Sequence, residues 1–212
     1  MSLNKKDDKK YSLESAIHSL IVPLGITSDD VEYSKQNLWL IDERLTYHYY
    51  LASDKHIKKG GKEEENKRAD LAVFNKPLAF AENDNPFQSI VIMEFKRPQR
   101  NDYTDKENPI VQVINYLKLI YDGKGTDRNG RPIIVNATTR YYVYIICDIT
   151  EKIHTTAKGY SALQSPDKLG YFWYNSNYNA YIEIMSFDKV LNDSKKRNRI
   201  LFEKLGLSDS II

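Results

Sequence analysis

One apolar segment, residues 89–95, restricts the possible folds of this chain more than any other feature. It reads Ser-Ile-Val-Ile-Met-Glu-Phe and follows a turn-rich stretch at 82–86, which is typical of a buried strand. Residues 71–74, Leu-Ala-Val-Phe, form a second strand-like run on the other side of that turn. We therefore expect the two runs to pair antiparallel, and a third strand is predicted over 140–148.

Helical patterns surround these strands. Apolar residues recur every seven positions from Val31 to Ala52, which predicts one long amphipathic helix over about 30–52. Pro109 favours the first turn of another helix, which we expect to end at Asp122 and Gly123. A short helix is predicted over about 11–20. After the core we expect two short aromatic strands, at 171–174 and 180–185, and then a terminal helix from 187 to near 206.

This order of elements predicts a mixed α/β domain with a central sheet. The 212 residues suit one globular domain that can bury a core of its own. We divide it into a lead-in and short helix at 1–27, a core at 28–150, and a C-terminal extension at 151–212 packed on the same domain.

Composition restricts location and partners. The net charge is only +2, so binding of a polyanion must depend on local clusters of basic residues. The single Cys147 lies in an apolar run and is expected to be a buried core residue, which fits a reducing, cytoplasmic setting. No window is apolar enough for a membrane span, and the first residues lack the apolar core of a signal peptide.

The residues best suited to catalysis or metal binding are Asp70, Glu94 and Lys96. Side chains alternate along a strand, so Glu94 and Lys96 share one face at its end, and antiparallel pairing can bring Asp70 beside Glu94. Two carboxylates with substrate phosphate and water suit Mg²⁺. By contrast, the four histidines are scattered without the spacing of zinc ligands.

Glu-x-Lys in a strand is by itself a common solvated pair, and it becomes specific only through its companions. Asp70 opens its strand in the sequence Arg-Ala-Asp, Glu94-x-Lys96 ends the next strand, and Gln112-x-x-x-Tyr116 follows on the predicted helix. In this order the three motifs resemble those of the PD-(D/E)xK nuclease superfamily, in its RecB-like branch, although Ala69 stands where the family often has Pro.

The resemblance spans roughly 38–148 and implies a restriction-endonuclease-like αβββαβ core with C-terminal strand and helix additions. For the first strand of that core, 56–59 is the nearby candidate. Some members add a glutamate from the first helix, for which we choose Glu43. The resemblance implies one or two Mg²⁺ or Mn²⁺ ions held by Asp70, Glu94, Glu43 and the Phe95 backbone carbonyl, with Lys96 assisting the attacking water and with Gln112 and Tyr116 positioning the site or the phosphates.

Basic residues beside this set are candidate DNA contacts. Arg97 and Arg100 follow Lys96 directly, at a turn made by Pro98, and either contact flanking phosphates or are solvated loop residues. The basic run at 195–199 is interpreted as the exterior of a helix, and the aromatic stretch 171–181 as a hairpin with one packed face.

The sequence thus predicts a divalent-metal-dependent nuclease that acts on DNA. The alternative is a non-catalytic or partner-dependent module on the same fold, which binds nucleic acid or protein. An enzyme acting on small phosphoesters is a third option. An ATPase partner, a larger parent protein and a homodimer all remain open.

Overall fold

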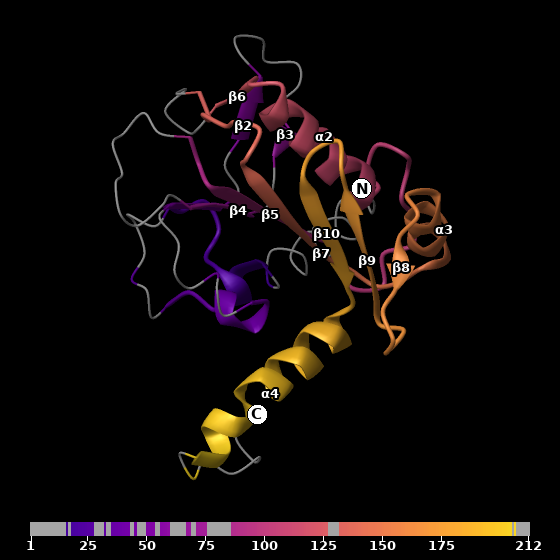
Figure 1. The fold of residues 1–212 in the computed structure, drawn as a ribbon. Helices are drawn as coiled ribbons and strands as arrows, with labels where there is room; N and C mark the ends of the chain where they lie inside the picture. The colour runs from indigo at the N-terminus through magenta and orange to yellow at the C-terminus, as the bar shows by residue number, and fades with distance from the viewer. Residues whose placement is uncertain are drawn as a thin grey trace, which may run out of the picture.

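The computed structural model describes residues 16, 18–27, 32, 35–42, 45, 50–53, 56–59, 67–68, 71–75, 86–126, 132–204 and 206. A seven-stranded mixed sheet organises them (Figure 1). Its strands, in spatial order, are β1 (Tyr50–Ser53), β4 (Leu71–Asn75), β5 (Ser89–Phe95), β7 (Arg140–Ile146), β10 (Ala180–Met185), β9 (Gly170–Asn175) and β8 (Leu163–Gln164). A small second sheet has the order β3 (Lys67–Arg68), β2 (His56–Lys59) and β6 (Gly125–Thr126).

The three central strands run parallel. β7 pairs parallel with β5 on one side and with β10 on the other, whereas β4 and β9 pair antiparallel with their inner neighbours. Helix α2 (Pro109–Tyr121) connects β5 to β7, as parallel neighbours require. The C-terminal ends of β5, β7 and β10 therefore lie at one edge of the sheet.

Both faces of the central strands are buried. Six of the seven residues of β5 are buried, which explains why this strand is apolar almost throughout. On one face Ile90 and Ile92 pack with α2 and with α3 (Glu151–Gly159). On the other, Val91 and Met93 pack with residues near the short helix η2 (Leu38–Leu40) and at the start of α4 (Phe187–Lys204), which projects from the sheet in Figure 1.

The predicted α/β class with a mixed central sheet is confirmed. The antiparallel pairing of 71–74 with 89–95 is confirmed by the β4–β5 ladder. The helix from Pro109, the third strand, the aromatic hairpin and the terminal helix are confirmed by α2, β7, β9–β10 and α4. In the stretch predicted as a short helix, the described residues 16 and 18–21 are helical.

The single long helix over 30–52 is wrong. Its described part contains the three-residue η2 and then strand β1, which pairs with β4. Leu38, Ile41 and Leu45 are nevertheless buried in one cluster, so the apolar recurrence identified core residues although it did not identify the backbone conformation. Pairing with the sheet outweighs the local helical pattern here.

The expectation for the first strand is also corrected. Residues 56–59 do form a strand, but β2 belongs to the small sheet, and β1 occupies the edge beside β4. Helix α3 and strand β8 were not predicted. Among the described residues, no helix is both long and apolar enough to cross a membrane.

Candidate functional site

Glu94 and Lys96 form a buried ion pair at the C-terminal end of β5. Their exposed fractions are 2% and 5%, and the Lys96 Nζ donates to Glu94 Oε1 over 2.5 Å. The backbone of Lys96 continues the sheet, because its N–H donates to the Ile146 carbonyl over 2.9 Å. Strand alternation places Glu94 on the face of Ile90 and Ile92, which is the face that α2 covers.

The loop after Lys96 is fastened to the end of β7. The Gln99 N–H donates to Asp148 Oδ2 over 2.5 Å, and Gln99 has a φ of 59°. A non-glycine residue with positive φ costs conformational energy, so the contact with Asp148 helps to hold this turn. This contact places the turn that follows Lys96 beside the segment that follows β7.

Helix α2 begins at the same edge, because it follows the loop from the end of β5 and leads back to the start of β7. Asn108 caps it: its Oδ1 accepts from the Ile110 N–H over 3.0 Å, and its Nδ2 donates to Thr156 Oγ1 of α3 over 2.9 Å. The two site residues predicted on this helix, Gln112 and Tyr116, lie after the cap. Gln112 lies in the first turns, half-buried, and Tyr116 is buried one turn further on.

The side-chain carbonyl of Gln112 is a notable polar atom in this helix. Its Oε1 is buried and has no hydrogen-bond partner among the residues that the structure describes. Buried polar groups in proteins nearly always have a partner, which is often water or a ligand. Gln112 is therefore suited to accept a hydrogen bond from a bound molecule or a water at this end of the helix.

Arg97 and Arg100 lie in the loop but are already engaged. Arg97 Nη2 lies 3.3 Å from Asp102 Oδ1, and Arg100 contacts Asp102 at 3.4 Å and Glu107 at 3.2 Å. Hydrogen bonds from Thr104, with a smaller contribution from Arg100, lower the pKa of Glu107. A phosphate would have to compete with these carboxylates, so the structure gives both arginines a role in ordering the loop.

Two of the predicted metal ligands, Asp70 and Glu43, lie outside the described residues. Within the described part of the chain, no three His, Cys, Asp or Glu side chains gather closely enough to hold a metal ion. The last described pair of the β4–β5 ladder is Leu71 with Met93, the sequence neighbours of Asp70 and Glu94. The Phe95 ring stacks on His18 on the opposite face, with centroids 5.2 Å apart, which leaves only its backbone for the site.

Cys147 lies near the pair and is inert. It is fully buried at the end of β7, as predicted, and burial raises the pKa of its thiol to about 12. A thiol in this state is not a nucleophile at neutral pH.

A second group of polar residues was not predicted from the sequence. Tyr142, Tyr144, Tyr181 and Glu183 line a cavity on the sheet face opposite to Glu94. The signal was the alternation of these residues with apolar ones in β7 and β10, which places them on a single face.

Neither a family model nor a curated protein sequence matches this chain.

Proposed function

We propose that the protein is a divalent-metal-dependent nuclease that hydrolyses phosphodiester bonds of DNA. The observation that carries this proposal is the buried contact between Glu94 and Lys96 at the edge where three parallel strands end. In sheets with parallel strands, this edge is the usual place for a ligand site.

Burial makes the pair chemically significant. Removing a carboxylate and an ammonium group from water costs several kcal/mol for each ion, and a well-packed apolar pair is often as stable or more so. The contribution of this 2.5 Å ion pair to stability is therefore a weak explanation for its presence. Buried charged groups of this kind are candidates for catalysis.

The donor chemistry of the site fits a hard cation. Glu94 supplies a carboxylate and Phe95 a backbone carbonyl, and by the family resemblance Asp70 and Glu43 supply two more carboxylates; Mg²⁺ and Mn²⁺ prefer such oxygen ligands. When bound, the ion neutralises charge on a phosphoryl oxygen and lowers the pKa of a coordinated water.

The protein's own residues supply position and charge. Lys96 keeps an ammonium group at the end of β5, where it can stabilise negative charge that develops on the phosphate or orient the attacking water. Gln112 offers a buried acceptor from α2, and Tyr116 packs that helix against the sheet. Arg97 and Arg100 are secondary to the proposal because of their ion pairs with Asp102 and Glu107.

The experiment is cleavage of supercoiled plasmid and of single-stranded DNA with Mg²⁺, with Mn²⁺ and with a chelator. Compared are the wild type, Asp70→Asn, Lys96→Met, the double variant E94Q/K96M and the control Lys152→Met. The double variant keeps the volume of the buried pair and removes both charges. Lys152 lies on α3 in an exposed ion pair with Asp105, so its variant controls for loss of surface charge.

We expect metal-dependent cleavage by the wild type and by the Lys152 variant, and loss of cleavage in the other three. Equal cleavage by all variants would refute the assignment. Metal-independent DNA binding by a wild type that does not cleave would favour the alternative of a partner-dependent binding module.

A further inference from the structure

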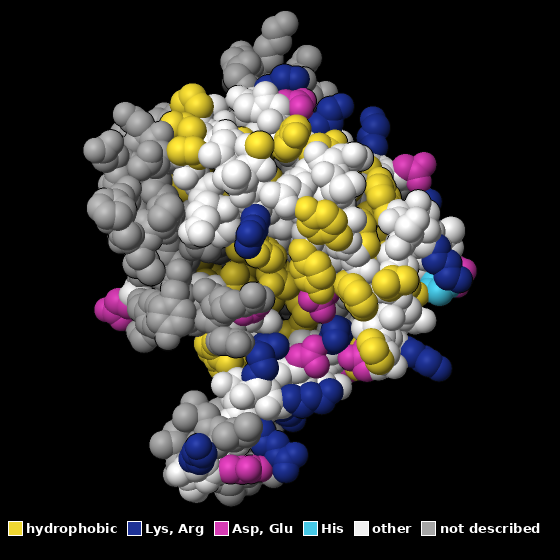
Figure 2. Space-filling model, viewed as in Figure 1, with side chains coloured by type: hydrophobic (Ala, Val, Ile, Leu, Met, Phe, Trp, Pro, Cys, Tyr) yellow, Lys and Arg dark blue, Asp and Glu magenta, His cyan; other side chains and the backbone are white. Residues whose placement is uncertain are grey.

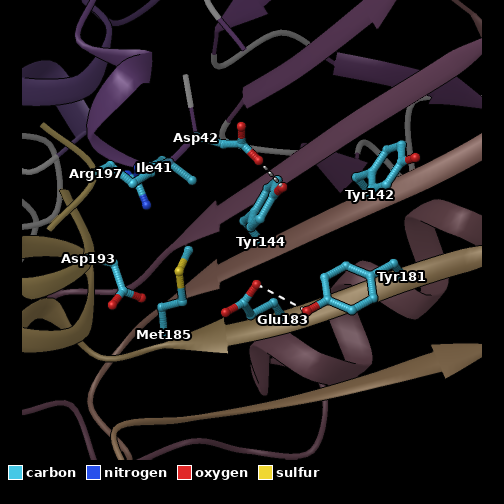
Figure 3. A pocket seen from close by; sticks show the side chains of 9 residues that line it. All are labelled: Ile41, Asp42, Tyr142, Tyr144, Tyr181, Glu183, Met185, Asp193 and Arg197. Atoms are coloured by element: carbon cyan, nitrogen blue, oxygen red, sulfur yellow. Dashed lines mark hydrogen bonds between the residues drawn. The ribbon is translucent and has the colours of Figure 1, made fainter. Parts of the chain in front are cut away.

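The face of the sheet opposite to Glu94 carries a cavity of about 390 Å³ (Figure 3). Its wall includes Asp42 after η2, the tyrosines of β7 and β10 with Glu183, and both Asp193 and Arg197 of α4, so among the described residues three of its four charged side chains are carboxylates. Figure 2 shows hydrophobic side chains over the strands on this side of the molecule, with acidic and basic side chains where α4 leaves the sheet. The volume is within the usual range for a site that binds a small molecule.

The carboxylates of this cavity are tied to tyrosine hydroxyls. The Tyr144 hydroxyl donates to Asp42 Oδ2 over 3.1 Å, and the Tyr181 hydroxyl donates to Glu183 Oε2 over 3.3 Å (Figure 3). The strand register supports the arrangement, because Glu183 is the direct neighbour of Tyr144 across the parallel β7–β10 ladder. Carboxylates and aromatic rings therefore border the same space.

The cavity is acidic. Burial raises the pKa of Glu183. The charge of Lys189 and the Tyr181 hydrogen bond lower it, and the negative charges of Asp193 and Asp42 raise it by smaller amounts. Asp193 and Asp42 thus lie close enough to Glu183 for their negative charges to disfavour its ionised form. A cation placed among them would relieve the repulsion, and an anion such as a DNA phosphate would increase it.

The basic residues of α4 offset part of this acidity, because Arg197 lines the cavity and Lys189 acts on Glu183 more strongly than Asp193 or Asp42 does. Lys189 Nζ divides its contacts between Asp167 at 3.1 Å and Asp193 at 2.9 Å. Arg197 Nη2 donates to backbone carbonyls, at 2.7 Å to Leu40 and at 3.2 Å to Trp39. These contacts hold α4 and η2 together as the walls of the cavity.

We propose that this cavity binds a small organic cation, an amine or a guanidinium compound, with its charged group beside Glu183 and Asp42 and among the rings of Tyr142, Tyr144 and Tyr181. Tyrosine rings attract cations through their negative faces, and carboxylates add a direct charge interaction. The site lies on the other side of the sheet from the Glu94–Lys96 pair, and none of its lining residues is assigned a role in the proposed nuclease activity.

The test is a calorimetric titration of the full chain with agmatine and with spermidine, with inorganic phosphate as the anionic comparison. The variants are Glu183→Gln, which keeps the shape of the side chain, and Tyr142→Leu, which removes a ring that lines the cavity. Glu151→Gln is the matched control, because Glu151 is an exposed carboxylate on α3. Thermal unfolding of each variant establishes that it is folded.

We expect saturable binding of at least one of the two cations by the wild type and no binding of phosphate. Glu183→Gln and Tyr142→Leu should each weaken the binding of that cation about tenfold or more, and the control variant should weaken it by less than about twofold. The proposal fails if neither cation binds saturably, or if the control weakens binding as much as the two cavity variants do. It also fails if both folded cavity variants bind like the wild type. None of these outcomes bears on DNA cleavage.

Discussion

Tyr144 and Asp42, which are 102 positions apart in the sequence, are joined by a hydrogen bond of 3.1 Å from the tyrosine hydroxyl to the carboxylate. The bond links the segment after η2 to strand β7. It thus connects the irregular N-terminal part of the described chain to the centre of the sheet.

Removal of this hydroxyl should destabilise the protein modestly. We expect Tyr144→Phe to lower the free energy of unfolding by about 1 kcal/mol, because it leaves a half-buried carboxylate without one donor. Urea denaturation measures the change. Tyr174→Phe is the matched control: its hydroxyl donates to Asn179 at an exposed position, so its loss should change stability by less than about 0.5 kcal/mol. Equal effects of the two variants would mean that the Tyr144 contact adds nothing beyond a surface hydrogen bond.

Breaking the Glu94–Lys96 pair should cost more than replacing it. Lys96→Met alone leaves a buried carboxylate whose ammonium partner is gone, for which we expect a loss of about 3–5 kcal/mol. E94Q/K96M should lose much less, because no buried charge remains. Urea denaturation of the two variants measures the difference. If the double variant is as unstable as Lys96→Met, the pair is needed for folding, and loss of cleavage could no longer be assigned to chemistry.

Acid should weaken the contacts of Asp167. A hydrogen bond from the Ser165 hydroxyl, with help from the Leu169 N–H and Lys189, lowers the pKa of Asp167 from 3.8 to about 2. A carboxyl group whose pKa is lower in the folded state stabilises the protein above its unfolded pKa, and this contribution is lost as the pH falls towards the folded value. The stability advantage of the wild type over Asp167→Asn should therefore be constant above about pH 5 and shrink between about pH 4 and pH 2. Urea denaturation over this range tests it, and an unchanging difference would contradict it.

Gly170 should tolerate no side chain. A Cβ at this position would lie 2.2 Å from the backbone oxygen of Ile184 on the neighbouring strand β10. Because a strand backbone cannot yield as a flexible side chain does, we expect Gly170→Ala to cost about 1–3 kcal/mol in unfolding free energy. Gly159 in α3 is the control, since a Cβ there meets nothing within 4 Å and alanine favours a helix by about 0.5–1 kcal/mol. The midpoint of thermal or urea unfolding should fall for Gly170→Ala and rise for Gly159→Ala.

The elements that sequence could predict are those with a strong local pattern. Strand β5 is apolar and follows turn residues, and α2 has a proline in its first turn and a stop at Asp122. Helix α3 was missed because it buries only Ile153 and Ala157, too few residues for a clear stripe, although Thr150 caps it and Glu151 opens it. The helix predicted over 30–52 was wrong because recurrence of apolar residues indicates burial, and burial is compatible with more than one backbone conformation.

The candidate site likewise has features that the sequence could predict and features that it could not. Alternation placed Glu94 and Lys96 on one face, but nothing in the motif distinguished a buried pair from a solvated one. The ion pairs of Arg97 and Arg100 depend on the loop conformation, which includes the Gln99–Asp148 contact across 49 positions of sequence. Such long-range contacts leave no local signal.

The central position of β7 has a consequence for the order of folding. The β4–β5 and β9–β10 pairs each join strands that are adjacent in the described sequence, and β7 is the strand that unites them. Local hairpins form faster than pairings between distant segments, so we expect the two antiparallel pairs to form early and the insertion of β7 to limit the rate. Until then each pair exposes an unpaired strand edge, and these edges are where misassembly between chains would start.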